Sequence, residues 1–425
     1  MASSAQNPFG ERPLAYGADG ALAMDGHSLE AIARDAGTPC YVYSAAALRA
    51  RARRLKALLA PGDQPAFSVK ACSSLGVLKV FADEGLSFDI VSGGELARLR
   101  RLGVEGARIV FSGAGKSAAE LQAALEARVR LVNIESLGEL DRLRAFARGS
   151  RITATVALRV NPDVAADTHE KIATGHAGAK FGLTPGEARQ AAAALAGDPW
   201  VRLEGLHIHL GSMLRRGDEF ARALQRLEPV LLSEEMRPHK LQWFNLGGGV
   251  AIPYRLEEPA TDPKPLLSPG IGFARRHKLR LMIEPGRYLV GPCGVLLTAV
   301  EYVKDRGERC FVVADAAMTE LLRPALYGAW HEIVPVRPAR GRGLRTFDVV
   351  GPVCETGDTL GAARTMPLPN PGDLLAVLDC GAYASSMASG YNSRPLAAEV
   401  LVDGETIRRI RRRQSAEELL GLETP

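Results

Sequence analysis

The stretch AFSVKACSSLGVLKVFADEGLSFDIV, residues 66–91, decides the fold of this 425-residue chain. It begins and ends with short apolar runs rich in β-favouring residues, and the segment between them has the periodicity of an amphipathic helix. A strand that leads through a helix into another strand is the unit from which parallel sheets are built. The stretch therefore predicts a β-α-β unit, and Lys70 stands where its first strand ends.

The same unit recurs on the C-terminal side of this stretch. A helix-like or loop segment follows each of eight β-type runs, which lie at residues 66–69, 87–91, 108–111, 130–134, 153–160, 202–208, 242–246 and 280–283. Eight consecutive βα units predict a closed parallel (β/α)8 barrel.

The β-α rhythm stops at about residue 295. Later segments are rich in Val, are punctuated by Gly, Pro and Asp, and contain few helix-like stretches. This pattern predicts a second, mostly antiparallel β domain of the sandwich or Greek-key type, within an α/β fold class overall. We expect residues 43–294 to form the barrel and residues 295–425 to form the β domain. Residues 1–42, with a helix at 28–36, are expected to pack with that β domain.

Composition and charge indicate a globular enzyme, with 46% hydrophobic and 24% charged residues. No apolar run approaches the ~18 residues of a membrane span, and the N-terminus lacks a secretory pattern, so a cytoplasmic protein without a membrane partner is expected. The basic run at residues 407–414 has no interleaved aromatic residues, which favours a solvated strand edge or tail over a nucleic-acid site. The six cysteines form no C-x-x-C pair, so neither a metal site nor a disulfide framework is predicted.

Polar or glycine residues close every one of the eight runs. In a (β/α)8 barrel these positions meet at one face, where the catalytic groups of barrel enzymes lie. Lys70 closes the first run, and Glu284 closes the eighth, with Arg287 three residues later. The seventh run ends in three glycines, Gly247, Gly248 and Gly249, at the usual phosphate site of this fold.

Each of these residues also has a plain structural explanation. Lys70 fits a lysine that points to the surface, and the glycine triplet fits a tight turn as well as a phosphate site. His207 and His209 alternate along the sixth run, so only one of them is expected to face inward, either against a ligand ring or as a core histidine.

Together, however, an amine, a carboxylate, an imidazole and a glycine-rich phosphate cradle are the groups that pyridoxal 5′-phosphate (PLP) requires. Lys70 would form the Schiff base with the aldehyde of the cofactor. Glu284 would keep its pyridine nitrogen protonated, which preserves the ring as an electron sink.

Longer motifs, in the same order, resemble the diaminopimelate decarboxylases. These belong to the barrel-type (fold type III) PLP decarboxylases, together with ornithine and arginine decarboxylases and, more distantly, alanine racemase. The motifs are FSVKA, DIVSGGEL, NIES, RVNPDV, KFGL, GLHIHLGS, NLGGG, EPGR, LLRPALYGAWH, GPVCETGD and GAYASSMASGYNSRP. The resemblance extends from about Gly37 to the C-terminus. It implies decarboxylation of meso-2,6-diaminopimelate to L-lysine and CO2, the last step of lysine biosynthesis.

The resemblance also implies roles for individual residues. Its implied cofactor contacts are Lys70, His209, Ser212, Gly247, Gly248, Gly249, Glu284, Gly286, Arg287 and Tyr383. Its implied substrate contacts are Arg287, Arg323, Tyr327, Glu355 and Tyr383, with the two arginines clamping the distal carboxylate. Cys354 is implied to transfer a proton, as a catalytic residue beside Lys70. In this family Cys354 and Glu355 reach into the barrel of the neighbouring subunit, which implies a homodimer with shared active sites.

Three positions depart from the family pattern, namely Cys72, Met213 and Ala317, where asparagine, glutamine and glycine are common. None of them removes a proposed catalytic group. Decarboxylation of another diamino acid and amino-acid racemisation stay open on the same fold. More remote alternatives are an aldolase that uses Lys70 without a cofactor and a non-catalytic PLP carrier. The aldolase has no use for Glu284, and the carrier has no use for the C-terminal β domain.

Overall fold

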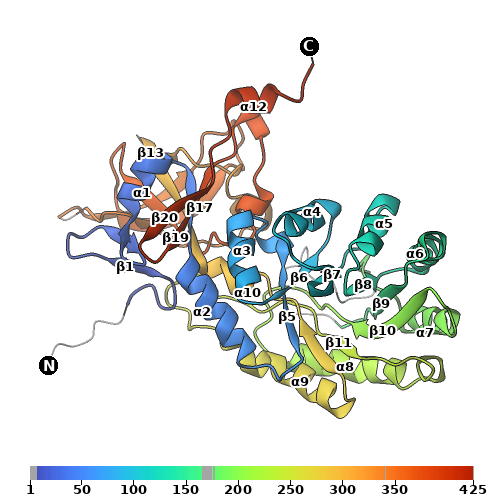
Figure 1. Ribbon diagram of the computed structural model, residues 1–425. Coiled ribbons are helices and arrows are strands. Elements are labelled where there is room, and N and C mark those ends of the chain that lie inside the picture. The colour runs from blue at the N-terminus through green and yellow to red at the C-terminus, as the bar shows by residue number, and fades with distance from the viewer. Residues whose placement is uncertain (1–6, 165–174, 176–177, 340, 425) are drawn as a thin grey trace.

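Eight parallel strands close into a barrel in the computed structural model, which describes residues 7–164, 175, 178–339 and 341–424 (Figure 1). They are β5 (Gln64–Ser68), β6 (Ser87–Ile90), β7 (Ile109–Phe111), β8 (Leu131–Ile134), β9 (Ala154–Arg159), β10 (Val201–His207), β11 (Trp243–Asn245) and β12 (Arg280–Ile283). Each strand pairs in parallel with the next, and β12 pairs with β5. The predicted barrel is confirmed, and each of the eight predicted runs overlaps one of its strands.

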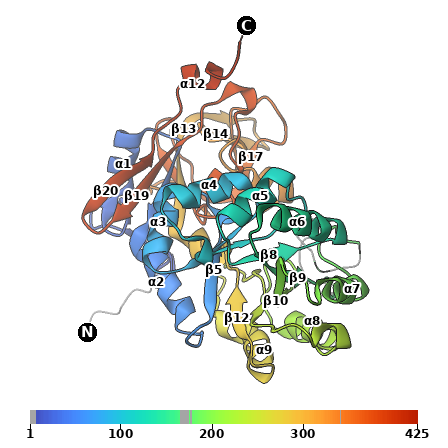
Figure 2. The same cartoon turned by 45° about the vertical axis from the view of Figure 1, so that its right-hand side comes forward.

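Helices surround these strands on the outside (Figures 1 and 2). They are α2 (Ala45–Lys56), α3 (Leu75–Asp83), α4 (Gly93–Arg101), α5 (Ala118–Glu126), α6 (Leu137–Ser150), α7 (Pro185–Leu195), α8 (Asp218–Leu231), α9 (Pro263–Arg276) and the short α10 (Arg287–Val290). A separate apolar cluster from six barrel strands consists of Ala66, Val110, Leu131, Ala157, Trp243 and Met282. Because these side chains pack together between the strands, chemistry is confined to the ends of the barrel.

Three barrel helices, α4, α5 and α6, begin with a Ser-x-x-Glu signal. In α4, the Ser92 hydroxyl accepts a hydrogen bond from the N–H of Glu95, and the Glu95 carboxylate accepts one from the N–H of Val91. Ser136 and Glu139 start α6 in the same way. These reciprocal bonds fix the loops that follow β6 and β8 at the carboxyl end of the barrel.

We expect Glu95→Gln to flatten the pH dependence of stability. Burial, together with the nearby charge of Asp89, raises the pKa of Glu95 to about 7 although the N–H of Val91 lowers it. Since this folded-state pKa lies above that of an unfolded glutamate, protonation stabilises the native protein at low pH. That contribution, up to about 3 kcal/mol, is lost as the pH rises to 7.

Melting temperatures between pH 5 and pH 8 test this expectation. The wild type should lose more stability over this range than Glu95→Gln, whose amide oxygen still accepts from Val91. Glu120→Gln is the matched control, because hydrogen bonds from the N–H groups of Ser117 and Gly93 lower the pKa of Glu120 and its titration falls below the range. Parallel profiles for the wild type and Glu95→Gln would contradict the assignment.

The second domain is a branched, mostly antiparallel sheet, as predicted. Its strands are β4 (Cys40–Ser44), β13 (Gly294–Asp305), β14 (Cys310–Ala314), β15 (Ile333–Pro335), β16 (Leu344–Val350), β17 (Thr359–Pro367), β18 (Leu374–Val377), β19 (Ala398–Asp403) and β20 (Thr406–Arg411). The long strand β13 joins the two halves, since it pairs with β4 and β18 in its first part and with β14 in its second. Only the pairs β14–β16 and β4–β19 are parallel among the described strands of this sheet.

The N-terminal segment lies against this sheet. It contains β1 (Leu14–Tyr16), β2 (Leu22–Met24), β3 (His27–Ser28) and α1 (Leu29–Ala36), which contains the predicted helix apart from its cap, Ser28. Arg12 forms a buried ion pair of 2.8 Å with Asp379, next to β18. We propose the division into residues 1–42, 43–294 and 295–425 as the domain organisation, with β4 running on to Ser44 across the first boundary.

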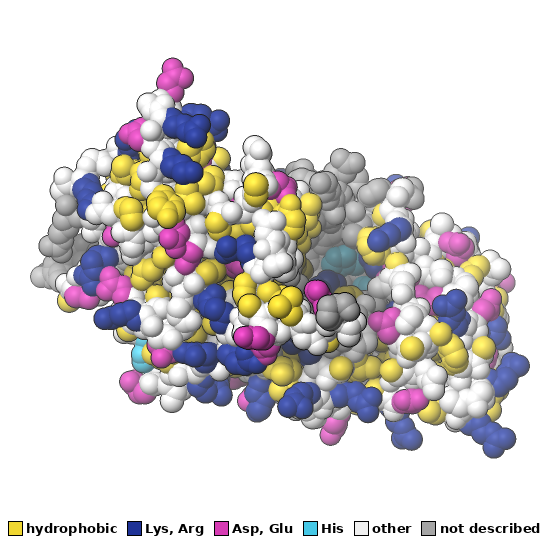
Figure 3. Space-filling view, turned by 90° about the horizontal axis from the view of Figure 1, so that it is seen from above, with side chains coloured by type: hydrophobic (Ala, Val, Ile, Leu, Met, Phe, Trp, Pro, Cys, Tyr) yellow, Lys and Arg dark blue, Asp and Glu magenta, His cyan; other side chains and the backbone are white. Residues whose placement is uncertain are grey.

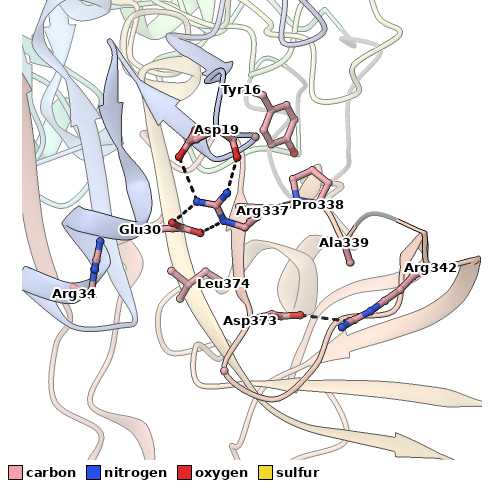
Figure 4. A pocket seen from close by; sticks show the side chains of 12 residues that line it. Tyr16, Asp19, Glu30, Arg34, Arg337, Pro338, Ala339, Arg342, Asp373 and Leu374 are labelled. Atoms are coloured by element: carbon pink, nitrogen blue, oxygen red, sulfur yellow. Dashed lines mark hydrogen bonds and ion pairs between the residues drawn. The ribbon is translucent and has the colours of Figure 1, made fainter.

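A groove of about 830 Å³ marks another contact between the N-terminal segment and the sheet (Figure 4). Arg337 forms ion pairs with Asp19 at 3.3 Å and Glu30 at 2.8 Å, and Arg342 lies 3.8 Å from Asp373. Since carboxylates of the chain itself already neutralise these arginines, we interpret the groove as an attachment between segments.

At the opposite end of the chain, β20 is the last strand of the sheet and its basic side chains are largely exposed, which is the expected strand edge. No described helix has the length and apolar character needed to cross a membrane.

Candidate active site at the mouth of the barrel

A cavity of about 380 Å³ lies at the carboxyl ends of the barrel strands. It brings together eight of the predicted site residues, namely Lys70, His209, Ser212, Glu284, Arg287, Arg323, Tyr327 and Tyr383. A smaller cavity of about 40 Å³ shares several of these walls and adds the backbone of Gly249 and Gly286. Figure 3 shows the molecule hollowed between its two lobes, with histidine side chains visible in the hollow.

Lys70 follows β5 in a single 3-10 turn, Val69–Ala71, that aims its side chain into the cavity. Its Nζ lies 3.3 Å from Oδ2 of Asp89, which is fully buried at the end of β6. The hydroxyl of Ser68 donates to the same oxygen at 2.9 Å. Burial alone would lower the pKa of Lys70, but the carboxylate of Asp89 outweighs it and raises the pKa. The amine is therefore held as an ammonium in the protein without ligand.

Glu284 follows β12 and is buried. Its Oε1 accepts hydrogen bonds from the amides of Asn245 at 2.5 Å and Asn133 at 3.4 Å, and its Oε2 lies 3.4 Å from Nε2 of His207. Burial alone would raise its pKa, but His207, Lys70 and the bond from Asn245 lower the pKa to about 2. An ionised carboxylate thus faces the cavity at neutral pH.

His209 is a neutral imidazole with a defined tautomer. The N–H of Gly248 donates to its Nδ1 at 3.1 Å, so the ring proton resides on Nε2. Burial and the charges of Lys70 and Arg159 lower its pKa well below the usual range. His207 lines the same cavity, so the expectation that only one of the two histidines faces inward is wrong. Side chains alternate between the two faces of a strand, so residues two positions apart share a face, and the expectation misapplied this period of two.

Two glycines of the triplet form a tight turn, and the third lines a cavity. The N–H groups of Gly247 and Gly248 donate to Asn245 and His209, so these glycines form the turn. Gly249 lines the smaller cavity, and a Cβ there would lie 2.5 Å from the carbonyl oxygen of Gly211. Gly286 lines it as well, where a Cβ would lie 2.8 Å from that of Ala71. Close packing therefore requires glycine at these two positions, and their backbone lines the smaller cavity.

Arg287 and Arg323 lie on the wall of the larger cavity. Arg287 donates from Nη1 to the hydroxyl of Tyr254 at 2.5 Å and from Nη2 to Ser212 at 3.3 Å, and its guanidinium lies 4.7 Å from the ring of Tyr383. The backbone N–H of Tyr383 donates to the carbonyl of Ala71 at 2.8 Å, which ties this loop of the β domain to the turn that carries Lys70.

Comparison with known proteins agrees with this geometry. Residues 45–291 match the family described as pyridoxal-dependent decarboxylase, pyridoxal binding domain. The chain is 42% identical to the diaminopimelate decarboxylase of Zymomonas mobilis, over 95% of this chain and 96% of that one. It is 44% identical to that of Pseudomonas fluorescens, over 95% and 97%.

The chain belongs to the diaminopimelate decarboxylase family. Among solved structures, it is similar to the diaminopimelate decarboxylase of M. jannaschii in complex with L-lysine, with a TM-score of 0.90, 31% identity and coverage of 97% and 98%. The enzyme of Helicobacter pylori complexed with L-lysine gives a TM-score of 0.88 at 34% identity, with coverage of 92% and 98%. The predicted resemblance is confirmed.

Two residues that the resemblance assigns to the site lie outside the cavity. Cys354 and Glu355 are exposed on the loop between β16 and β17, and neither lines the cavity that contains Lys70. The N–H of Cys354 donates to the side chain of Asn392 at 3.3 Å. One chain by itself therefore does not bring Cys354 to the cavity of its own barrel.

The three departures from the family pattern have different surroundings. Cys72 is fully buried beside Tyr43, and burial raises the pKa of its thiol to about 12, so it is an unreactive packing residue. Met213 adopts a positive φ of 67°, and Ala317 is buried with its N–H donating to Glu320.

Three residues of the site escaped the sequence interpretation. Asp89 is one of the polar residues that close the second run, but nothing in the local pattern indicates that it pairs with Lys70. Tyr254 lies in the loop after β11, and His331 just precedes β15; each contacts a cavity arginine. The motif LLRPALYGAWH contains His331, but no spacing rule connects it with Arg323.

Proposed function

We propose that this protein is a PLP-dependent carboxy-lyase that converts meso-2,6-diaminopimelate to L-lysine and CO2, the last step of lysine biosynthesis, as a cytoplasmic homodimer. The observation that carries the proposal is one cavity with Lys70 and Glu284 in its wall and two buried arginines, Arg287 and Arg323, in the same wall. Membership of the decarboxylase family argues against the aldolase and the PLP carrier.

The residues at the mouth of the barrel fit PLP. Lys70 would hold its aldehyde carbon, the backbone of Gly249 and Gly286 with Ser212 would hold its phosphate, and the neutral ring of His209 would lie against its pyridine ring. The ionised carboxylate of Glu284 suits a protonated ring nitrogen. When bound, PLP delocalises the electron pair that remains on the α-carbon after CO2 leaves.

The carboxylates of Asp89 and Glu284 determine where protons reside in the site. Lys70 must lose a proton before its nitrogen can act as a nucleophile, and Asp89 is an acceptor at 3.3 Å. Burial and the charge of Glu284 raise the pKa of Asp89, but its carboxylate also raises the pKa of Lys70, so the proton resides on the amine in the protein without ligand. Glu284 itself stays ionised because His207, Lys70 and the hydrogen bond from Asn245 lower its pKa.

Substrate choice depends on the two arginines. A carboxylate at the far end of the substrate would pair with Arg287 and Arg323, and bidentate guanidinium geometry suits this planar anion. Ornithine and arginine have no carboxylate there, so they would leave two buried cations uncompensated, which is a large penalty. We expect CO2 release and L-lysine from meso-diaminopimelate, and at least about 1,000-fold lower kcat/KM for ornithine and arginine.

An assay of CO2 release, with chiral analysis of the product, tests this proposal against the two alternatives on the same fold. Comparable rates with ornithine or arginine would replace it by a broader diamino-acid decarboxylase. Interconversion of amino-acid enantiomers without CO2 release would replace it by a racemase.

The dimer is proposed because the loop with Cys354 and Glu355 is exposed in one chain and would complete the cavity of a second. Glu355 would accept the ammonium at the distal end of the substrate, and Cys354 would return a proton to the α-carbon. Tyr327 and Tyr383 would complete the substrate pocket from the cavity wall.

A further inference from the structure

Arg287 and Arg323 are two like charges on the wall of one buried cavity, and they are only 7% and 6% exposed. Among the described residues, neither guanidinium forms an ion pair with a carboxylate of the chain. Two unneutralised cations would normally separate or turn to solvent. Something other than a carboxylate must hold them in place.

Tyr254 contacts both arginines. Its hydroxyl oxygen accepts a hydrogen bond from Nη1 of Arg287 at 2.5 Å. The guanidinium carbon of Arg323 lies 4.7 Å from the centre of the Tyr254 ring, within the range of a cation–π contact. A single buried side chain thus presents its hydroxyl lone pair to one cation and its ring electrons to the other.

His331 holds Arg323 from another side. Nη1 of Arg323 lies 2.6 Å from Nε2 of His331, and Nδ1 of His331 lies 2.8 Å from the carbonyl oxygen of Leu378. A guanidinium can only donate, so Nε2 is the acceptor and the ring proton resides on Nδ1, where it is donated to Leu378. Burial and the charge of Arg323 lower the pKa of His331 well below the usual range, which keeps this acceptor neutral.

Both supporting residues are themselves held. The His331 ring meets the Tyr254 ring edge-on, with centroids 5.0 Å apart. Arg12 donates to the carbonyl of Pro253 at 2.9 Å and pairs with Asp379, so it holds the residues adjacent to Tyr254 and to Leu378. The network therefore connects the N-terminal segment, the barrel and the β domain behind the two arginines.

We propose that Tyr254 and His331 are positioning residues, which hold Arg287 and Arg323 as a preformed receptor for a carboxylate and so set substrate selectivity. The proposal rests on the proposed function, in which these arginines bind the distal carboxylate of diaminopimelate. A receptor that is already assembled needs no reordering of long side chains when the substrate enters, so its binding free energy is retained.

Removing single atoms from the network tests the proposal in the purified holoenzyme. We expect Tyr254→Phe to raise KM for meso-diaminopimelate about 10- to 100-fold, as for loss of a hydrogen bond to a charged group, with kcat changed less than about 3-fold. The visible spectrum of the bound cofactor should not change. Tyr16→Phe, which removes a hydroxyl bonded to Pro335, is the matched control and should leave KM unchanged, because neither residue lines the cavity.

His331 allows a rescue experiment. His331→Leu removes the acceptor for Arg323 and should raise KM by a similar factor. In His331→Gln the amide oxygen can replace Nε2, and we expect KM within about 3-fold of the wild type. If His331 had only a structural role, His331→Leu and His331→Gln would have the same KM at equal cofactor content. If His331→Leu does not fold, the KM of Tyr254→Phe decides whether the positioning proposal holds.

A double-mutant cycle separates this proposal from the proposed function. Arg323→Ala alone should raise KM, and adding His331→Leu to Arg323→Ala should have no further effect, because the arginine to be positioned is gone. If Arg323→Ala raises KM but Tyr254→Phe does not, or if the His331→Leu effect persists without Arg323, the positioning role is wrong and the clamp stands. An unchanged KM in Arg323→Ala would overturn the clamp itself, and the positioning role with it.

Discussion

Lys70→Ala should yield a colourless protein whose decarboxylation rate is lower by about 10⁴-fold or more, since covalent attachment of the cofactor and the nucleophilic amine are lost together. Lys70 is the only lysine that lines the larger cavity among the described residues. The measurements are CO2 release and the absorbance between about 330 and 450 nm, where PLP adducts absorb.

Lys79→Ala is the matched control for this experiment. Lys79 lies in α3, is exposed and pairs with Asp83 at 2.6 Å, so its loss should change neither colour nor rate. A coloured, active Lys70→Ala protein, or a wild type that stays colourless after incubation with PLP, would refute the assignment of Lys70.

Cys354→Ala should keep the absorbance of the bound cofactor and lose turnover by about 10²- to 10⁴-fold, the range for removal of a general acid. No residue of the loop between β16 and β17 lines the two cavities that contain the proposed cofactor residues, so binding and turnover should separate. Unchanged turnover would remove Cys354 from the reaction.

Mixing inactive variants tests whether two chains build each site. If Cys354 serves the barrel of its neighbour, a heterodimer of Lys70→Ala and Cys354→Ala chains contains one site with both native residues. Random exchange should then restore about a quarter of the wild-type activity, because half of the dimers are mixed and each has one intact site. Differently tagged subunits verify that exchange has occurred.

The mixture of Lys70→Ala with Glu284→Gln is the control for this test. Lys70 and Glu284 line the same cavity of one barrel, so a mixed dimer has one defect in each barrel and should stay inactive. Mixed dimers of Lys70→Ala and Cys354→Ala that form without activity would rule out the shared site.

Local sequence patterns carried much of the fold and part of the site. The alternation of short β-favouring runs with amphipathic segments predicts the barrel, because burial on both faces of a parallel strand and on one face of a helix imposes different periodicities. Lys70 and Glu284 follow directly, since parallel strands bring their carboxyl ends to one rim whatever the loops between them do.

Other features depend on contacts between distant segments. The strand ends indicate that Lys70 and Asp89 share a rim, but their 3.3 Å ion pair depends on the turn after β5.

By itself, the sequence determined the barrel, the β domain and the rim on which the chemistry is expected, because these depend on short-range periodicity and strand direction. Only the tertiary structure decided that Gly247 and Gly248 form a turn while Gly249 lines a cavity. It also decided that Tyr254 and His331 contact Arg287 and Arg323. Such contacts join loops from the barrel and the β domain, and their geometry is set by packing in three dimensions, which no local spacing encodes.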